Sequence, residues 1–374
     1  MLHPSALFLF AFATVFAAQE AIECKIVTFP VSAIANNEDF GNSFDPENAT
    51  SINQFVTQSL NNGAAGVVGQ ISTSIVLSIS AQYCAPAGAT HPETLPIQLL
   101  AHGNTCDRTI WDALSEPNLQ ASGYSYQRYF ASRGYATLAI DLPGHGNSTL
   151  PDPNTVVQMP IEAAVINSIA ASLRSTNNAL GIAFPKVVFT GHSYGSITGV
   201  AAARFDPDFV DAMVLTGWSA FVPLPSPMLL LQMQSAALLF NRFQGYPLGY
   251  ITASNETGHE AIFYSGNYDP AIPKMSFEAQ DVMTCGEGGS LVEGLQPASG
   301  FSGKILAVTG SDDILFCNPK NGVCADQLTN SSFLFPDAAL FQSQVINDTG
   351  HHFMLHSSSA KALAIIQQFL ESDV

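Results

Sequence analysis

The sequence predicts an α/β fold in which a mostly parallel central sheet is flanked by helices, with a cap inserted late in the sheet. Short apolar runs alternate with helical patterns, and this alternation favours parallel strands that are buried on both faces. Glycine and polar residues gather where the runs end, which is where open sheets of this class bind ligands. The runs begin at residues 96, 135, 186, 211, 304 and 343, and helical patterns occupy residues 160–175 and 195–205.

The chain begins with an uncharged, almost wholly apolar stretch from Ala6 to Ala18. This length suits the core of a secretory signal peptide and is too short for a membrane helix, which needs roughly 20 residues. Small residues at Ala17 and Ala18 allow cleavage before Gln19. We therefore expect residues 1–18 to be a signal peptide and the mature protein to be secreted, without stable membrane anchoring.

Two strand-like runs follow, over residues 24–34 and 71–83. The second of them alternates apolar and small polar residues, as a half-buried strand does. The stretch between them, residues 36–51, is polar and rich in asparagine. We expect it to be an exposed loop.

Five Asn-X-Ser/Thr sequons are spread along the chain. In a protein with a signal peptide, such sequons are acceptors for N-linked glycans on exposed loops. We expect glycosylation at some of these positions, which are Asn48, Asn147, Asn255, Asn330 and Asn347.

Six cysteines follow the predicted cleavage site, and an even number in an oxidising compartment indicates up to three disulfides. One pair would join the two strand-like runs, one would close an Asn-Gly turn, and the remaining pair would tether the cap beside the site. The expected pairs are Cys24–Cys84, Cys317–Cys324 and Cys106–Cys285, among the fifteen connectivities that six cysteines allow. No Cys-x-x-Cys or His/Cys cluster with metal spacing occurs in the sequence, so we expect no metal site.

The composition limits the partners and the position of the cap. The formal net charge of −18 argues against nucleic acid and against an anionic membrane surface as partners. Residues 212–255 interrupt the strand–helix alternation and contain a single charged residue, Arg242, with no carboxylate. We divide the mature chain into a core of residues 19–218 and 301–374 and a cap of residues 219–300.

The residues from Gly191 to Gly195 read Gly-His-Ser-Tyr-Gly and match the Gly-x-Ser-x-Gly pattern. This pattern forms a strained strand-to-helix turn that exposes its serine at the start of the helix. An apolar run precedes the motif and a helix pattern of small residues follows it, as the motif requires. This context predicts that Ser193 is a nucleophile.

From about Leu95 to its C-terminus the chain resembles the α/β-hydrolase family, whose catalytic residues follow the order nucleophile, acid, histidine. The segment KILAVTGSDD resembles the family strand that ends in Gly-x-x-Asp. This assigns the acid to Asp313, with Asp312 the weaker candidate. The segment NDTGHHF resembles the final Gly-His of the family, which assigns the base to His351 rather than His352.

The same resemblance implies an oxyanion hole made of two backbone N–H groups. Tyr194, directly after the nucleophile, should donate one of them. By similarity to the family's His-Gly-x segment, Asn104 should donate the other, while His102 and Gly103 shape the turn. The turn of residues 141–146 also resembles a family segment and is interpreted as scaffold.

Ser193 excludes the epoxide hydrolases and dehalogenases of this fold, which use aspartate at the elbow. The lack of carboxylates in residues 212–255 disfavours aminopeptidases that hold a free amine with acidic cap residues. The resemblance and the apolar cap imply a serine hydrolase that cleaves a carboxylic ester or lactone of a hydrophobic small molecule through an acyl-enzyme, without a cofactor. Two alternatives stay open, a peptidase or amidase with the same triad and a non-catalytic binding protein on this scaffold.

Overall fold

The computed structural model describes residues 22–63, 66–317 and 322–372. The predicted signal peptide, residues 1–18, lies outside the described residues. None of the helices in the described part of the chain has the length and apolarity that a membrane crossing needs.

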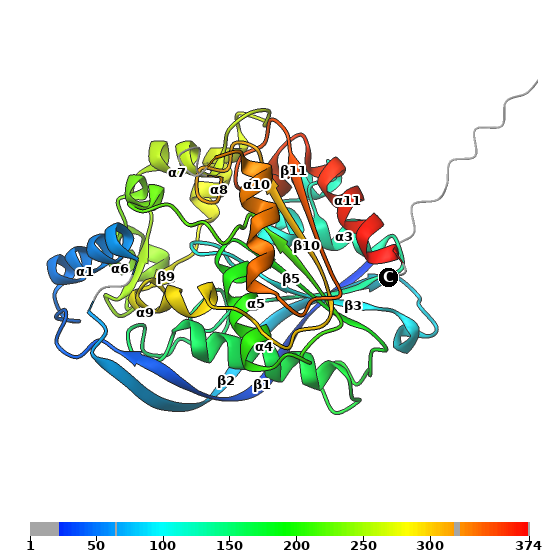
Figure 1. Ribbon diagram of the computed structural model, residues 1–374, viewed down its shortest axis with the longest axis horizontal. Coiled ribbons are helices and arrows are strands. Elements are labelled where there is room, and N and C mark those ends of the chain that lie inside the picture. The colour runs from blue at the N-terminus through cyan, green and yellow to red at the C-terminus, as the bar shows by residue number, and fades with distance from the viewer. Residues whose placement is uncertain (1–21, 64–65, 318–321, 373–374) are drawn as a thin grey trace, which may run out of the picture.

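A mostly parallel eight-stranded sheet forms the centre of the molecule, which confirms the predicted fold (Figure 1). Its order is β1-β2-β4-β3-β5-β6-β10-β11. The pairs β1/β2 and β2/β4 are antiparallel, and all the other pairs are parallel. The strands are β1 (Ile22–Asp39), β2 (Gly69–Pro86), β3 (Ile97–Ala101), β4 (Ala136–Ile140), β5 (Val187–His192), β6 (Ala212–Thr216), β10 (Lys304–Gly310) and β11 (Leu340–Ile346).

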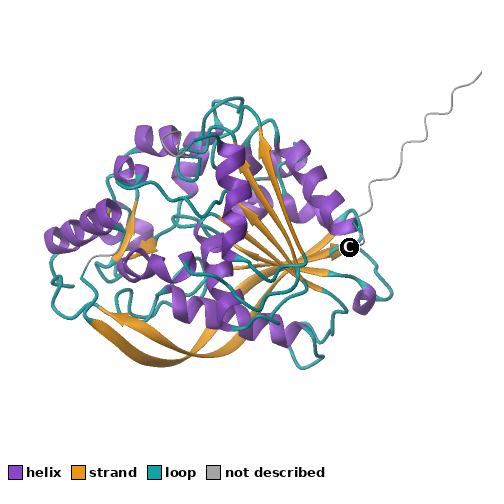
Figure 2. Cartoon of the chain, viewed as in Figure 1, coloured by secondary structure: helices purple, strands orange, loops and turns teal. Residues whose placement is uncertain are grey.

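Helices cover both faces of this sheet (Figure 2). Side chains alternate across the strands, so Leu99 of β3 belongs to a core that includes residues of α4 and α5, whereas Leu100 belongs to a core shared with α3 and α11. Burial on both faces explains the continuous apolar runs of the sequence. The helices of the core are α2 (Pro117–Ala121), α3 (Tyr126–Ala131), α4 (Met159–Leu173), α5 (Tyr194–Phe205), α10 (Cys324–Asn330) and α11 (Ser359–Glu371).

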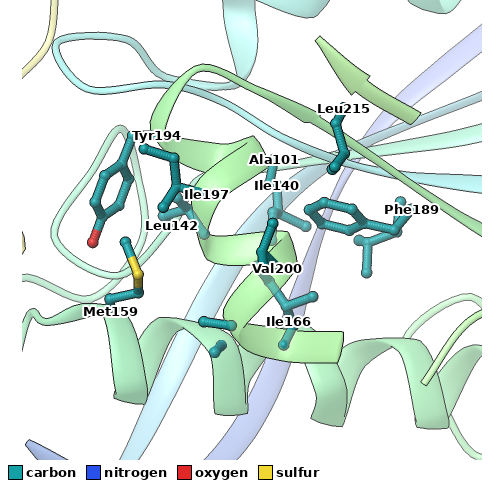
Figure 3. Close-up of a cluster of buried hydrophobic side chains, with 14 of the residues drawn as sticks. Ala101, Ile140, Leu142, Met159, Ile166, Phe189, Tyr194, Ile197, Val200 and Leu215 are labelled. Carbon is teal, nitrogen blue, oxygen red and sulfur yellow. The ribbon is translucent and has the colours of Figure 1, made fainter. Parts of the chain in front are cut away.

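The core beneath helix α5 holds the β5–α5 turn in place (Figure 3). Val200 and Ile166 bring α5 and α4 together over Phe189 of β5. Gly199 faces the same ring, and a Cβ atom there would lie 2.2 Å from Phe189 Cε1. The absence of a side chain at Gly199 therefore lets α5 approach the strand that precedes it.

The chain between β6 and β10, residues 217–303, forms a separate small unit that we call the β6–β10 insertion. It contains a three-stranded sheet in the order β7-β8-β9. Its elements are β7 (Gln234–Ser235), α6 (Ala236–Leu239), β8 (Tyr250–Thr252), α7 (Glu256–Phe263), α8 (Ile272–Ala279), β9 (Met283–Thr284) and α9 (Cys285–Ser290). Short 3₁₀ turns occur here at η3 (Pro227–Leu231), η4 (Asn241–Phe243) and η5 (Leu291–Leu295), and in the core at η1 (Pro92–Thr94), η2 (Arg108–Ser115), η7 (Ser331–Leu334) and η8 (Phe353–Leu355).

An arm made of β1, helix α1 (Ala49–Asn62) and β2 leaves the sheet and extends toward the insertion (Figure 1). The strands pair with each other along their whole length, but β2 pairs with β4 only from Ala81 to Cys84. The predicted strands at 24–34 and 71–83 lie inside β1 and β2.

The prediction of an exposed loop over residues 36–51 is confirmed for residues 40–48, which form turns and are mostly exposed, and is wrong at both ends. Residues 36–39 continue β1, and α1 begins at Ala49. Asn48 caps this helix, because its side-chain oxygen accepts hydrogen bonds from the backbone N–H groups of Thr50 and Ser51. The buried residues of α1 recur at helical spacing and are Ile52, Phe55, Val56 and Ser59. The polar cap signal and the polar outer face hid this helix from the sequence reasoning.

Two of the three expected disulfides are formed. Cys24 and Cys84 are opposite each other in the β1/β2 register and are joined, and Cys317 is joined to Cys324.

The prediction of a Cys106–Cys285 disulfide is wrong, since both residues are buried free thiols. They point into different cores, Cys106 into the one shared with α3 and α11 and Cys285 into the one shared with α4 and α5. The expected tether is made by the backbone instead. The N–H of Thr105 donates to the carbonyl of Val282 at 2.9 Å, and the N–H of Asp281 donates to the carbonyl of Thr105 at 2.8 Å.

We expect the two free thiols to be unreactive until the chain unfolds. Burial raises the pKa of Cys106 above its ordinary value and that of Cys285 to about 12, so neither thiolate is populated near neutral pH. Titration with Ellman's reagent should detect no thiol in the native protein and two per chain in non-reducing denaturant. A disulfide-linked peptide containing Cys106 and Cys285 in non-reducing digests would contradict this expectation.

Candidate active site

Ser193 lies in the sharp turn between β5 and α5 and has a left-handed backbone, with φ 55° and ψ −121°. This conformation is costly for a residue with a Cβ atom and persists only where the surroundings impose it. The backbone N–H of Ser193 donates to the carbonyl of Thr216 on β6 at 2.9 Å. A Cβ atom at Gly195 would lie 2.4 Å from the carbonyl oxygens of Ala101 and His102. The turn can therefore close against the end of β3 only with glycine there.

His351 follows β11 and is fully buried. Its Nδ1 atom lies 2.8 Å from Oδ2 of Asp313, and its ring stacks on that of Phe316 with a centroid distance of 5.6 Å. Its Nε2 atom is buried and has no hydrogen-bond partner among the described residues. A carboxylate at Nδ1 keeps the proton of neutral imidazole on that nitrogen, which leaves Nε2 as an acceptor.

The structure brings Asp313, and not Asp312, to this histidine. Asp313 Oδ2 also accepts the hydroxyl of Thr309 at 2.7 Å, and its Oδ1 accepts the backbone N–H groups of Leu315 and Phe316 at 3.0 and 3.2 Å. The Asp312 carboxylate instead accepts the hydroxyl of Ser311 at 2.9 Å. Four hydrogen bonds orient the Asp313 carboxyl group, as expected for a residue that must hold an imidazole in one position.

His352, the weaker of the two histidine candidates, points elsewhere. Its ring stacks on Phe263 with a centroid distance of 4.3 Å, and its Nδ1 lies 3.4 Å from the hydroxyl of Tyr264. Burial, with smaller effects from neighbouring histidines, holds the pKa of His352 well below its ordinary value. The side chain is neutral and contacts no carboxylate among the described residues.

The two expected oxyanion donors, Asn104 and Tyr194, line one cavity together with Ser193. In the described part of the chain neither backbone N–H has a hydrogen-bond partner, so both remain available to a ligand. A Cβ atom at Gly103 would lie 2.8 Å from the Cβ atom of Ser193, so glycine lets the Asn104 loop pass beside the serine.

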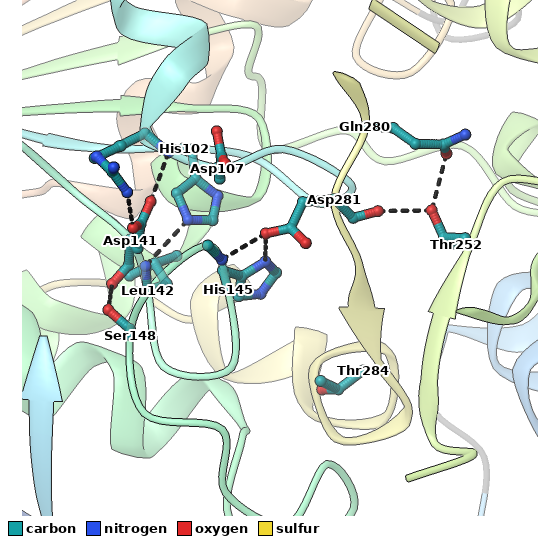
Figure 4. Close-up of polar contacts among 12 residues, drawn as sticks. His102, Asp107, Asp141, Leu142, His145, Ser148, Thr252, Gln280, Asp281 and Thr284 are labelled. Carbon is teal, nitrogen blue, oxygen red and sulfur yellow. Dashed lines mark hydrogen bonds and ion pairs between the residues drawn. The ribbon is translucent and has the colours of Figure 1, made fainter. Parts of the chain in front are cut away.

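His102 has the structural role that the sequence suggested. Burial holds its pKa well below the ordinary value, so the ring is neutral. Its Nδ1 lies 2.9 Å from the carbonyl of Gly103, and its Nε2 accepts the backbone N–H of Leu142 at 3.1 Å (Figure 4). The ring therefore connects the Asn104 loop to the turn of residues 141–146. Asp141 anchors this turn by accepting the backbone N–H of Asn147 at 3.0 Å and by pairing with the Arg108 guanidinium.

The cavity above Ser193 holds about 720 Å³ of empty space, open solvent at its mouth included. None of its lining residues carries a charged side chain. Residues of α1, α5 and the β6–β10 insertion contribute to it. They include Leu60, Ile197, Val222, Leu224, Met228, Phe263, Met283 and Leu291, and the segment after β10 adds Leu315 and Phe316.

Charged groups lie directly behind this apolar surface. The hydroxyl of Tyr194 donates to Oε2 of Glu162 at 2.5 Å. Glu162, Glu287 and His145 are fully or almost fully buried, and their nearest polar atoms all lie within 4.8 Å of one another. His145 Nε2 is 3.0 Å from Oε1 of Glu287. Two carboxylates this close cannot both be ionised in a dry site, and burial together with the charge of Glu287 raises the pKa of Glu162 well above its ordinary value.

His145 is the cation of this group. Burial alone lowers its pKa, but the carboxylates of Glu287, Asp281 and Glu162 outweigh that effect and raise it to about 10. Asp281 faces the other ring nitrogen of His145 at 3.9 Å and accepts the backbone N–H of Gly146 at 2.6 Å (Figure 4). Burial raises the pKa of Asp281 to about 7, and the nearby His145 limits the rise.

Sequence reasoning missed these acidic residues, although one signal was present. Thr284 and Glu287 form a capping box at the start of α9, in which the Glu287 N–H donates to the Thr284 hydroxyl at 3.0 Å. Glu162 lies in a helix with no other charged residue, where a single carboxyl group had no visible partner.

Two groups of buried side chains are close enough to share a metal ion, namely His192, His351 and His352, and His145, Glu162 and Glu287. In both groups protein partners already engage part of the donor set, through the His351–Asp313 and His145–Glu287 contacts. That the protein needs no metal stays a prediction.

The contribution of Asp281 to the free energy of unfolding should fall as pH rises from 4 to 7. Its folded pKa of about 7 exceeds the ordinary value of 3.8, so folding favours its protonated form and loses that contribution as the group ionises. Buried neutral histidines such as His102 act in the opposite direction, since their lowered pKa makes stability fall as pH drops below 6.5. Urea unfolding of the parent protein and of Asp281→Asn should therefore be compared across this range. The free energy of unfolding of the parent, taken relative to that of the variant, should decrease as pH rises from 4 to 7. Parallel curves of the two proteins against pH would contradict the assignment.

The sequence matches the model of the alpha/beta hydrolase family over residues 98–364. No curated protein sequence matches the chain. Among solved structures, a thermophilic esterase from Thermogutta terrifontis is similar at 18% identity and a TM-score of 0.50, covering 83% of this chain and 96% of its own. The enol-lactonase from Burkholderia xenovorans is similar at 17% identity and a TM-score of 0.51, covering 79% and 96%. At this level of identity the structural likeness shows the fold, and the family match shows that the chain belongs to the alpha/beta hydrolase family.

Proposed function

We propose that this protein is a secreted serine hydrolase that cleaves a carboxylic ester or lactone of a hydrophobic substrate through an acyl-enzyme on Ser193. The observation that carries the proposal is the cavity itself. It joins Ser193 and the unpartnered N–H groups of Asn104 and Tyr194 to a surface without charged side chains. An uncharged acyl or alcohol group fits such a surface, because burying a charge there would cost several kcal/mol.

In this mechanism Nε2 of His351 removes the proton of the Ser193 hydroxyl, and Oγ attacks the substrate carbonyl carbon. The negative charge that develops on the carbonyl oxygen is bound by the N–H groups of Asn104 and Tyr194. His351 then gives its proton to the leaving alkoxide oxygen, and the carbon–oxygen bond breaks to leave an acyl-enzyme. Water attacks the acyl carbon by the same route and restores the serine, while Asp313 stabilises the transient imidazolium.

We propose that the β6–β10 insertion, which contains residues 219–300, acts as the cap over this site. It supplies apolar residues to the cavity, among them Leu224, Met228 and Phe263. No carboxylate lines the cavity in the described structure, and this disfavours a peptidase that holds the free amine of its substrate. The hydrogen-bonded Asp313–His351 pair disfavours a purely binding role, since binding alone does not require it.

Several features support secretion of the protein. Four of the sequon asparagines, at positions 48, 147, 330 and 347, are exposed. Asn255 is half-buried, and its Nδ2 donates to the carbonyl of Leu230 at 3.0 Å. The two disulfides are likewise typical of an oxidising compartment. We expect glycans at these four exposed asparagines in preference to Asn255.

Ser193→Ala should abolish ester hydrolysis while leaving the fold intact. Only the attacking oxygen is removed, and loss of a triad nucleophile costs on the order of 10⁴- to 10⁶-fold in turnover. The measurement is hydrolysis of p-nitrophenyl esters beside the matching anilides, with circular dichroism as the control for folding. Labelling of the parent protein, but not of the variant, by a fluorophosphonate would identify the same serine. More than a tenth of the parent activity in the variant would rule out Ser193 as the nucleophile.

Asp313→Asn should lower kcat by about 10⁴-fold, because an amide at this position favours the wrong imidazole tautomer and cannot stabilise imidazolium. Asp312→Asn is the matched control, since it makes the same chemical change one residue away on a side chain that does not contact His351. Its kcat should stay within about tenfold of the parent. If the Asp312 variant were the inactive one, the assignment of the acid would be wrong.

A further inference from the structure

Part of the wall of the catalytic cavity comes from the arm, which lies outside the residues that match the family. The family match begins at residue 98, whereas α1 spans Ala49–Asn62. Ser59, Leu60 and Gly63, at and just beyond the C-terminal end of this helix, line the same cavity as Ser193. The helix thus supplies surface to a site whose candidate catalytic groups all come from the core.

The arm holds α1 in this position through contacts at the far end of β1 and along the helix. At the far end of β1, the backbone N–H of Glu38 donates to Oε1 of Gln158 at 2.7 Å, and Nε2 of Gln158 donates back to the Glu38 carbonyl at 3.0 Å. Along the helix, Phe55 packs against Phe40 with a centroid distance of 5.3 Å. A Cβ atom at Gly289 of α9 would lie 2.4 Å from the Phe40 ring, so α9 and this aromatic pair are in close contact.

The end of α1 that lines the cavity is joined directly to the β6–β10 insertion. The backbone N–H of Ser226 donates to the carbonyl of Leu60 at 2.8 Å. A Cβ atom at Gly63 would lie 3.2 Å from Cδ1 of Leu224. The helix also contacts β7, η3 and α9, and Figure 1 shows it at the end of the molecule opposite the C-terminus. The wall formed by α1 and the insertion is therefore continuous.

Resting on the function proposed above, we infer that helix α1 is a specificity element for the apolar group of the substrate and that Leu60 is its specificity-determining residue. Leu60 is half-buried and presents an apolar side chain to the cavity, while its backbone carbonyl maintains the contact with the insertion. A change of its side chain alters the space available to the substrate and leaves that backbone contact in place.

The test uses the full-length protein with Leu60→Ala, which enlarges the cavity, and Leu60→Trp, which fills it. Thr57→Trp is the matched control, because Thr57 lies on the exposed side of the same helix. Two series of graded alkyl length are used, p-nitrophenyl esters for kcat/KM and fluorophosphonates for the rate of Ser193 labelling. The phosphonate series reports on the cavity even where turnover of esters is slow.

Leu60→Trp should lower the ratio of decanoate to acetate kcat/KM by about tenfold or more, since misfit of a few methylene groups in an apolar pocket has effects of this size. Leu60→Ala should shift the preferred chain to a longer one, and Thr57→Trp should leave the ratio within about twofold. The phosphonate labelling rates should change in the same direction.

Two results would overturn the inference, and they differ from a failure of the proposed function. Labelling of Ser193 with an unchanged chain-length preference in both Leu60 variants would show that α1 does not select the substrate. Equal changes in Leu60→Trp and Thr57→Trp would show a general disturbance of the helix and would also refute it. If no phosphonate of any length labelled Ser193 in the parent protein, the proposed function would fail and the inference with it.

Discussion

The left-handed backbone of Ser193 is the constraint on which the rest of the site depends. Such a conformation costs on the order of 1–3 kcal/mol for a residue that is not glycine. Burial of a single large aliphatic side chain contributes about 1.5–3 kcal/mol, and α5 buries both Ile197 and Val200 against the core. The packing of this helix is therefore sufficient to hold the strained turn. Gly195 and Gly199 remove the side chains that would keep the helix away from β3 and β5.

Buried polar contacts join the insertion to the core, beside the apolar packing that the two share. His145 of the core pairs with Glu287 of the insertion, and the backbone of Thr105 pairs with residues 281 and 282. A buried ion pair is stable only if its geometry is good and its remaining atoms are satisfied. Here the capping box gives Glu287 further hydrogen bonds. The contact thereby fixes where the insertion lies over the sheet.

Tyr194 separates these buried charges from the substrate cavity. Tyr194 lines the cavity, while its hydroxyl donates to Glu162. One residue thus offers a free backbone N–H to the cavity and satisfies a buried carboxyl group behind it. This arrangement explains how a cavity without charged lining residues can adjoin a cluster of four titratable groups.

The sequence alone determined the features that local patterns encode or that the family resemblance implies. The apolar runs became strands because each is buried on both faces, and the glycine pattern around Ser193 implied the turn that the structure shows. The pairing of Asp313 with His351 was implied by the resemblance to the α/β-hydrolase family, and the structure places both after neighbouring strands of one parallel sheet. Cys24 and Cys84 were expected on adjacent strands, where the register now places them opposite each other.

Only the tertiary structure decided the features that depend on partners distant in the chain. Helix α1 has a short apolar face that packs on Phe40 and on elements of the insertion more than 160 residues away, so its local sequence resembled a polar loop. Cys106 and Cys285 were expected to pair, but the sheet separates the two cores into which their side chains point. Glu162 and Glu287 come together from α4 and α9, and this shared burial, which no local pattern encodes, raises the pKa of Glu162.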